Sequence, residues 1–326
     1  MEAFEYARPA TSREAVKMLA SGNAEVLAGG SDLLQRMKDS VSTPGRLVSL
    51  RDARDLRGIE YTPAKGLRIG AMVTLEELAS HPDAHRHYRV VAQAAEKAAS
   101  PQIRNVGTVG GNLCQRPRCW YYRNGFGLLA MQDGKSLVPN GENQYHAILG
   151  NGGPAYFVSP SNLAPALIAA DARLRVLGPS GSRLIGVSEL YATPQSEGES
   201  EFSLKPGEIV TEVLVPPGGG PGAFYEVRQK ANFDWPLATA AVALHMDGRT
   251  VKSARVVMGQ VAPIPWRSPE AEQALAGKTI SADVAEAAGK AAVAKATPLS
   301  KNGYKVTLAG VAVKRAVLRA AGMESA

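Results

Sequence analysis

Hydrophobic and polar positions along the first 55 residues predict a small unit of alternating strands and helices. The pattern indicates two helices and two strands: helices over 12–19 and 33–38, and strands over 25–28 and 47–50. Thr11 or Ser12 can cap the first helix, with Glu14 in its first turn. Pro44 and Gly45 break the second helical pattern before the second strand. This segment therefore predicts a β-α-β unit.

The middle of the chain mixes short strands with alanine-rich helices. Strands are predicted over 67–71, 155–159 and 172–177, and helices after Thr74, over 89–99 and over 163–170. Thr74 and Glu77 fit a capping box, Pro101 is expected to end the second of these helices, and Asn162 is expected to start the third. Residues 114–155 show no sustained period, and a loop of that length in a compact protein is usually functional or disordered.

A Pro- and Gly-rich stretch at 216–222 is the clearest domain boundary. Beyond it, the pattern predicts two strands joined at Asp247-Gly248, over 238–245 and 254–259, and three helices, over 268–276, 281–295 and 304–320. The expected domains are 1–58, 59–217 and 218–326, and the last of them is α+β.

Composition excludes several classes of protein. The chain has 326 residues, a formal charge of +7 and two cysteines. Two cysteines are too few to form the disulfide framework of a small secreted protein, and they cannot by themselves provide a four-cysteine metal site. The excess charge is spread out, so no nucleic-acid partner is expected, and no apolar run is long enough to span a membrane. The first residues lack a basic region followed by an apolar run, so a cytoplasmic location is expected, with export on a partner's signal peptide left open.

Two glycine-rich turns carry the strongest indication of ligand binding. The first covers 27–33, between a predicted strand and helix, and the second covers 107–113, with Thr108 and Asn112 as hydrogen-bond partners. Glycines let the backbone approach a ligand closely, and free N–H groups at a helix start suit phosphate oxygens. Neither turn fits the dinucleotide fingerprint or the P-loop. Two tight turns without a ligand are the alternative, but the pair favours a diphosphate held between two units.

The remaining reactive residue types predict no metal or catalytic site. His81, His85 and His87 lie in a polar stretch and are expected in a solvated helix or loop. Cys114 and Cys119 are five positions apart, which is a poor metal spacing, so they are interpreted as small packing groups. No catalytic residue is assigned, because no Ser-His-Asp or Cys-His set follows from spacing alone.

The two turns together resemble the FAD-binding medium subunit of the xanthine dehydrogenase family of molybdenum hydroxylases. The resemblance rests on VLAGGSDL at 26–33 and TVGGNL at 108–113, and further segments in the same order extend it over nearly the whole chain: 69–75, 159–167, 204–208 and 259–267. The run QRPRCWYYR at 115–123 is similar to the aldehyde-oxidoreductase-like branch.

The resemblance implies a fold and a set of cofactor contacts. Two subdomains of the vanillyl-alcohol oxidase (PCMH) type would hold FAD between them, and an α+β flavoprotein domain would follow. The FAD diphosphate would be cradled by the backbone of the first turn, at Leu27, Ala28, Gly29, Gly30, Ser31, Asp32 and Leu33. Further contacts to the diphosphate, the flavin and the rest of the cofactor would come from Thr108, Gly110, Gly111, Asn112, Asn162, Ala71, Ile103 and Val210.

Two departures from the family pattern qualify these implications. Some relatives carry a four-cysteine iron–sulfur cluster in the loop after Arg123, but residues 124–146 contain no cysteine, so no cluster is expected in this chain. A lysine near the flavin in relatives is replaced by Glu226, with Arg228 and Lys230 close in sequence. A carboxylate there would disfavour an anionic reduced flavin.

The expected function is electron transfer through FAD. Electrons from a molybdopterin site in a large partner subunit would arrive through a small [2Fe–2S] subunit and pass to an acceptor such as NAD⁺, oxygen or a quinone. The assembly would be a heterotrimer that could itself dimerise. Two alternatives are an assembly subunit that has lost FAD and a stand-alone FAD oxidase with its own substrate pocket.

Overall fold

The N-terminal unit is a three-stranded parallel sheet with helices alongside it. The computed structural model describes residues 1–20, 22–230 and 234–324. The sheet has the order β1-β3-β2, from Glu5–Ala7, Arg46–Ser49 and Ala24–Leu27, and the helices are α1 (Ser12–Leu19) and α2 (Leu33–Lys38). Thr11 caps α1 by accepting from the Glu14 N–H, which confirms that start. Two 3₁₀ turns, Leu50–Asp52 and Arg54–Leu56, lead to the next sheet.

The second unit is built on a five-stranded antiparallel sheet. Its order is β4-β5-β10-β8-β9, from Ile59–Thr62, Gly66–Gly70, Ile209–Val215, Arg173–Gly178 and Gly181–Gly186. The chain inserts its helices between β5 and β8: α3 (Leu75–Ala79), α4 (Pro82–His87), α5 (Arg89–Glu96), α6 (Pro101–Arg104), α7 (Val109–Leu113) and α9 (Leu163–Ala169); a 3₁₀ turn, Val187–Leu190, follows β9. The Thr74–Glu77 capping box at α3 and the start of α9 after Asn162 are both present, as predicted.

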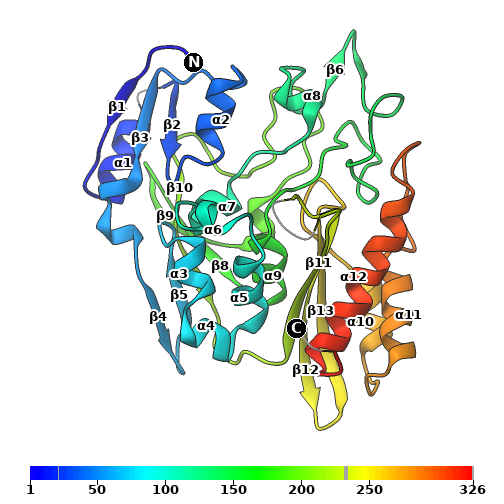
Figure 1. Cartoon of the computed structure of the whole chain (residues 1–326). Helices are drawn as coiled ribbons and strands as arrows, with labels where there is room; N and C mark the ends of the chain where they lie inside the picture. The colour runs from blue at the N-terminus through cyan, green and yellow to red at the C-terminus, as the bar shows by residue number, and fades with distance from the viewer. Residues whose placement is uncertain (21, 231–233, 325–326) are drawn as a thin grey trace.

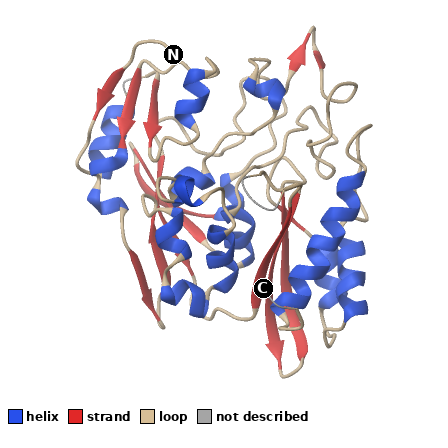
Figure 2. Ribbon diagram, viewed as in Figure 1, coloured by secondary structure: helices blue, strands red, loops and turns tan. Residues whose placement is uncertain are grey.

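The third unit places three helices against one face of a four-stranded sheet, as Figure 2 shows. The sheet has the order β11-β12-β13-β14, from Gly222–Val227, Ala238–Asp247, Thr250–Gly259 and Trp266–Arg267. The helices are α10 (Pro269–Leu275), α11 (Ala282–Ala292) and α12 (Tyr304–Ala320). Helices α5 and α9 of the second unit pack against this sheet as well, so one hydrophobic core joins the two units.

The long segment after α7 is mostly irregular, in agreement with its lack of period. It contains one turn of helix, α8 (Trp120–Arg123), and a two-residue hairpin of β6 (Met131–Gln132) and β7 (Lys135–Ser136). It returns against the third unit, where Ile148 and Leu149 both donate to the Val261 carbonyl, at 2.9 and 3.0 Å. These bonds fix the loop without a regular sheet.

Three local predictions were wrong. Residues 155–159 form no strand, because the Ser159 N–H bonds the Ala262 carbonyl (2.9 Å) of a loop rather than a neighbouring strand. Helix α5 ends at Glu96, and Ala99 has a φ of 49°, which no helix accommodates. Pro101 therefore opens α6 instead of ending α5. No secondary structure was predicted for the glycine-rich turn at 107–113, and it contains the short helix α7, capped by Thr108.

Candidate functional site

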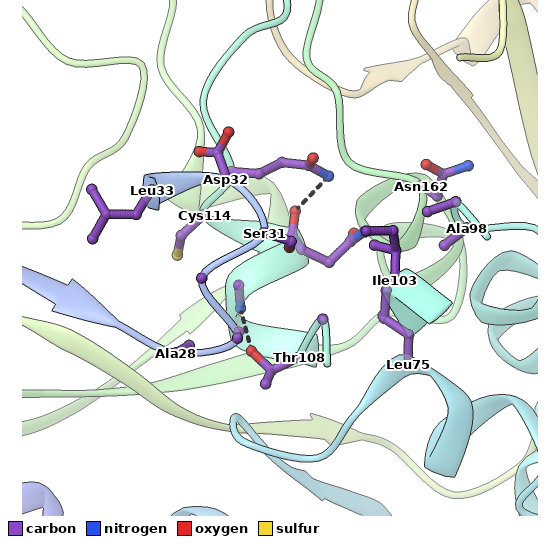
Figure 3. A pocket seen from close by; sticks show the side chains of 18 of the residues that line it. Ala28, Ser31, Asp32, Leu33, Leu75, Ala98, Ile103, Thr108, Cys114 and Asn162 are labelled. Carbon is purple, nitrogen blue, oxygen red and sulfur yellow. Dashed lines mark hydrogen bonds between the residues drawn. The ribbon is translucent and has the colours of Figure 1, made fainter. Parts of the chain in front are cut away.

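A cavity of about 570 Å³ lies where the two glycine-rich turns meet. It is the candidate site, and Figure 3 shows part of its lining. Every site residue predicted from the sequence except Leu27 lines it: Ala28, Gly29, Gly30, Ser31, Asp32, Leu33, Ala71, Ile103, Thr108, Gly110, Gly111, Asn112, Asn162 and Val210. Leu27 is the last residue of β2 and packs into a small apolar cluster with Leu33, Met37 and Leu47.

The first turn needs glycine for two different reasons. At Gly29, a Cβ would lie 1.9 Å from the Val106 carbonyl oxygen, because the two turns touch backbone to backbone there. Gly30 has a φ of +75°, a left-handed conformation that residues with a Cβ rarely adopt. The close approach therefore joins the N-terminal unit to the second unit at the wall of the cavity.

The two turns differ in how their N–H groups are used. Among the described residues, the N–H groups of Gly29, Gly30 and Ser31 donate to no protein acceptor. In the second turn, Gly110 N–H bonds the Ala71 carbonyl at 2.9 Å, and Gly111 N–H bonds Thr108 Oγ1 at 3.0 Å. Unpaired N–H groups beside a cavity are the donors that an anionic ligand needs. The first turn therefore provides free backbone donors. The second turn provides part of the cavity wall and the hydroxyl hydrogen of Thr108.

Two asparagines hold the inner wall of the cavity. Asn112 Oδ1 accepts from Ser161 Oγ (2.7 Å) and from the Leu163 N–H (3.2 Å), which links α7 to the start of α9. Asn162 is buried, and its Nδ2 has no hydrogen-bond partner within the described residues. A buried amide without a partner costs free energy, so this side chain is suited to a ligand acceptor.

Asp32 is the centre of a cluster of arginines. Its carboxylate accepts from Arg123 Nη2 (2.8 Å) and the Arg116 N–H (3.0 Å), and it also pairs with Arg118 (3.1 Å) and Arg36 (3.4 Å). Burial alone would raise the pKa of Asp32, but Arg118, the Arg116 N–H and Arg123 together lower it below its ordinary value. The ionised carboxylate therefore ties the segment after α7 to the first turn.

Sequence reasoning did not assign several residues that line the cavity. Arg118 and Gln115 come from the QRPRCWYYR run, and Trp235 and Pro236 come from the segment before β12. In the sequence this run indicated only one branch of the family, although its high density of arginines could have indicated a binding role. Nothing in the sequence indicated that a segment beyond β11 reaches a cavity between the first two units.

Glu226 does not line the cavity. Its carboxylate pairs with Arg228 at 2.8 Å, and both side chains are about one-tenth exposed. Burial raises the pKa of Glu226, although the Arg228 guanidinium opposes the shift. Arg228 also donates to the Lys97 carbonyl, next to Ala98 and Ala99 of the lining. The charge of the Glu226 carboxylate is therefore compensated by the Arg228 guanidinium, and the carboxylate does not contact the cavity directly.

Neither cysteine is activated. Cys114 lines the cavity, and burial, with a contribution from Glu201, raises its pKa to about 12. The Cys119 Sγ lies 3.1 Å from His146 Nε2, and burial raises the pKa of this thiol as well.

Among the described residues, no three His, Cys, Asp or Glu side chains gather as a metal site would need. Within the same residues, no helix has the length and apolarity to cross a membrane.

Comparisons with known proteins place the chain in a family. Residues 2–218 match the FAD binding domain in molybdopterin dehydrogenase, and residues 223–320 match the CO dehydrogenase flavoprotein C-terminal domain. The aldehyde oxidoreductase FAD-binding subunit PaoB of Escherichia coli is 34% identical over 322 residues, 95% of each chain. The carbon monoxide dehydrogenase medium chain of Hydrogenophaga pseudoflava is 29% identical over 96% of each chain.

Solved structures have the same fold. A carbon monoxide dehydrogenase structure from Hydrogenophaga pseudoflava matches with a TM-score of 0.77, at 28% identity and over 99% of both chains. Quinoline 2-oxidoreductase from Pseudomonas putida matches in fold with a TM-score of 0.78. The expected family and fold class are confirmed. The chain belongs to the FAD-binding medium subunits of the molybdenum hydroxylases, and it is therefore an oxidoreductase subunit.

Proposed function

We propose that this chain holds FAD in the cavity between its two glycine-rich turns and passes electrons from a [2Fe–2S] partner subunit to an external acceptor. The observation that carries the proposal is the row of unpaired N–H groups at Gly29, Gly30 and Ser31, three residues that line a cavity of about 570 Å³. That volume lies within the range of pockets that hold drug-sized ligands and cofactors. FAD supplies the redox chemistry, and the protein supplies binding, orientation and electrostatics.

The residues present fit a diphosphate-containing cofactor. The three free N–H groups would donate to diphosphate oxygens. Thr108 Oγ1 accepts from Gly111 N–H and so keeps its own hydrogen to donate. Asn162 Nδ2, buried and without a partner, would donate to a cofactor acceptor and thereby lose its unsatisfied state. Ala71 and Val210 would provide apolar contacts to the same ligand.

The test is whether the purified chain retains flavin. We expect absorption bands near ~450 nm and release of the flavin on denaturation, as for a non-covalent cofactor. Gly111→Val should abolish retention, because a side chain there enters the space between the turns, with only Thr108 Oγ1 (2.9 Å) and Ala28 Cβ (3.9 Å) near its Cβ. Gly30→Val is the poorer variant, since the positive φ makes it a test of folding.

Gly152→Val is the matched control. Gly152 is exposed, has no neighbour within 4 Å of a Cβ and lies outside the cavity, so flavin retention should be unchanged. A colourless wild-type chain that takes up no added FAD would remove the proposed function and leave the assembly subunit. Full retention in Gly111→Val would remove the assignment of the cavity.

The partners are proposed by family membership. A large molybdopterin subunit and a small [2Fe–2S] subunit would complete a heterotrimer, and the large subunit would select the substrate. Co-purification of a tagged chain from its native cells should recover both. Recovery of a flavin-loaded chain without either partner would favour the stand-alone oxidase. The cytoplasmic location stays a prediction from the sequence.

A further inference from the structure

A second, smaller cavity of about 210 Å³ adjoins the first. Its lining comes from the segment after α7 and from the third unit, and it is rich in aromatic side chains: Trp120, Tyr145, Phe157 and Trp235. Trp120 and Tyr145 meet edge to face, with ring centroids 5.6 Å apart. The volume is below that of pockets for drug-sized ligands, so it suits a ligand with a ring of about one substituted benzene's size.

The titratable groups beside this cavity favour an uncharged ligand. Burial raises the pKa of the Cys119 thiol, and burial together with Lys305 lowers the pKa of His146 to about 4. At neutral pH both groups are therefore uncharged, and the thiol hydrogen bonds the imidazole at 3.1 Å. Asp234 also lines the cavity and adds a carboxylate, which would repel an anion.

Of the two basic side chains beside the cavity, Lys305 is fully engaged by protein acceptors and Arg118 only in part. Lys305 Nζ donates to the carbonyls of Gln260 (2.7 Å), His146 (3.0 Å) and Tyr145 (3.1 Å), which uses all three of its hydrogens. Arg118 Nη2 pairs with Asp32 at 3.1 Å, whereas Arg118 Nε has no hydrogen-bond partner within the described residues. A nicotinamide dinucleotide is much larger than a single ring, and this cavity does not have the volume for one.

One polar group is placed to recognise a carbonyl oxygen. The Tyr145 hydroxyl donates to Gln229 Oε1 at 3.2 Å, which fixes which end of this amide faces the tyrosine. Among the described residues, Gln229 Nε2 donates to no protein acceptor, and it borders the cavity. An amide N–H beside aromatic rings is a suitable donor for an oxygen on a planar ring.

The second cavity shares a wall with the first. Arg118, Asp234, Trp235 and Pro236 line both, and the Arg118 guanidinium lies over the Trp235 ring, 4.7 Å from its centroid. This cation–π pair therefore lies where the two cavities adjoin. A ring in the second cavity would therefore lie next to whatever occupies the first.

We propose that the second cavity binds a quinone, the class of electron acceptor that takes electrons from FAD held in the first cavity. This inference rests on the proposed function. The quinone accepts two electrons and two protons and becomes the hydroquinone, while FADH₂ loses both electrons and both protons and becomes FAD. The aromatic side chains and the small volume favour this uncharged ring over a dinucleotide, and the Gln229 amide would donate to one of its oxygens.

Binding can be measured without turnover. The probe is duroquinone, whose four ring methyl groups prevent addition to the Cys119 thiol. Equilibrium dialysis with the full chain, as purified, should show one equivalent bound. Leu237→Phe adds a ring to the cavity wall, and Gln229→Leu removes the amide donor; each should raise the Kd by about tenfold or more. Leu184→Phe, on exposed strand β9, is the matched control and should leave the Kd unchanged.

A second measurement follows the flavin. After anaerobic reduction, duroquinone should reoxidise the protein-bound flavin, and Leu237→Phe should slow this by about tenfold. Ferricyanide, which needs no organic pocket, should react at the wild-type rate in both. Equal duroquinone affinity in wild type, Leu237→Phe and Gln229→Leu would overturn the proposal, as would no binding to a flavin-loaded chain. If Leu237→Phe fails to fold, Gln229→Leu decides alone. If the wild-type chain carries no flavin and takes up none, the proposed function is refuted rather than the quinone site. Equilibrium dialysis then still measures whether duroquinone binds in the second cavity.

Discussion

The Asp32 carboxylate accepts a 2.8 Å hydrogen bond from Arg123 Nη2, across 91 positions of the sequence. Asp32 is the N-cap residue of α2, and Arg123 is the last residue of α8. The contact brings the segment after α7 over the first turn, so that Arg118 and Gln115 reach the cavity. A single carboxylate therefore holds together the two halves of the site.

Asp32→Asn should destabilise the fold by about 3 kcal/mol, because it leaves buried guanidinium groups without their counter-charge. Denaturant unfolding at neutral pH measures this change. Asp52→Asn is the control; it breaks the exposed pair with Arg8 and should cost no more than about 1 kcal/mol. Similar losses in the two variants would contradict the role given to Asp32.

The same carboxylate predicts a pH dependence. Since the folded-state pKa of Asp32 is lowered, its contribution to stability is fully present above its ordinary value of 3.8 and is lost as the pH falls through the lowered value. The stability difference between wild type and Asp32→Asn should therefore shrink on acidification. A difference that stayed constant down to the acid transition would show that Asp32 is not ionised in the fold.

Gly29→Ala should destabilise the contact between the two turns by about 1–3 kcal/mol, because the new Cβ would overlap the Val106 carbonyl oxygen. Gly152→Ala is the matched control and should be nearly neutral. Thermal unfolding of both proteins checks the prediction. An unchanged melting temperature for Gly29→Ala would mean that the turns do not touch as described.

Glu226→Lys should weaken this protein. It places a like charge beside buried Arg228 and should cost about 3–5 kcal/mol. The exchange Glu226→Arg with Arg228→Glu should recover most of that loss, since it restores a pair of opposite charges. Denaturant midpoints measure both. A stable Glu226→Lys single variant would count against a structural ion pair.

Lys305→Met should be destabilising, because the Gln260 and Tyr145 carbonyls lose this donor and the His146 carbonyl keeps only Asn302 Nδ2; a buried carbonyl left without a donor costs about 1–3 kcal/mol. Burial lowers the pKa of Lys305 from 10.5 to about 7, so the unfolded chain binds this proton more tightly between those values. The stability of wild type relative to Lys305→Met should accordingly rise from pH 7 towards 10. Lys290→Met, at an exposed position on α11, is the control and should show no such trend.

Much of the local structure could be predicted from the sequence. The capped start of α1, the hairpin at Gly248 and the span of α12 follow from periodicity and turn residues, which act between near neighbours. The failures at 155–159 and around Ala99 have different causes. At 155–159 the Ser159 N–H bonds the distant Ala262 carbonyl, whereas α5 stops early because Ala99 has a left-handed φ and Ser100 then caps α6.

The sequence by itself determined the two glycine-rich turns, and with them the residue types that a diphosphate needs. Only the tertiary structure decided that their N–H groups differ, since pairing of Gly110 with Ala71 depends on a distant strand end. It also decided that Arg118 and Trp235, which lie 117 positions apart, form one wall between two cavities. Short-range rules describe neighbours along the chain, whereas burial, charge pairing and cavity shape depend on which distant segments fold together.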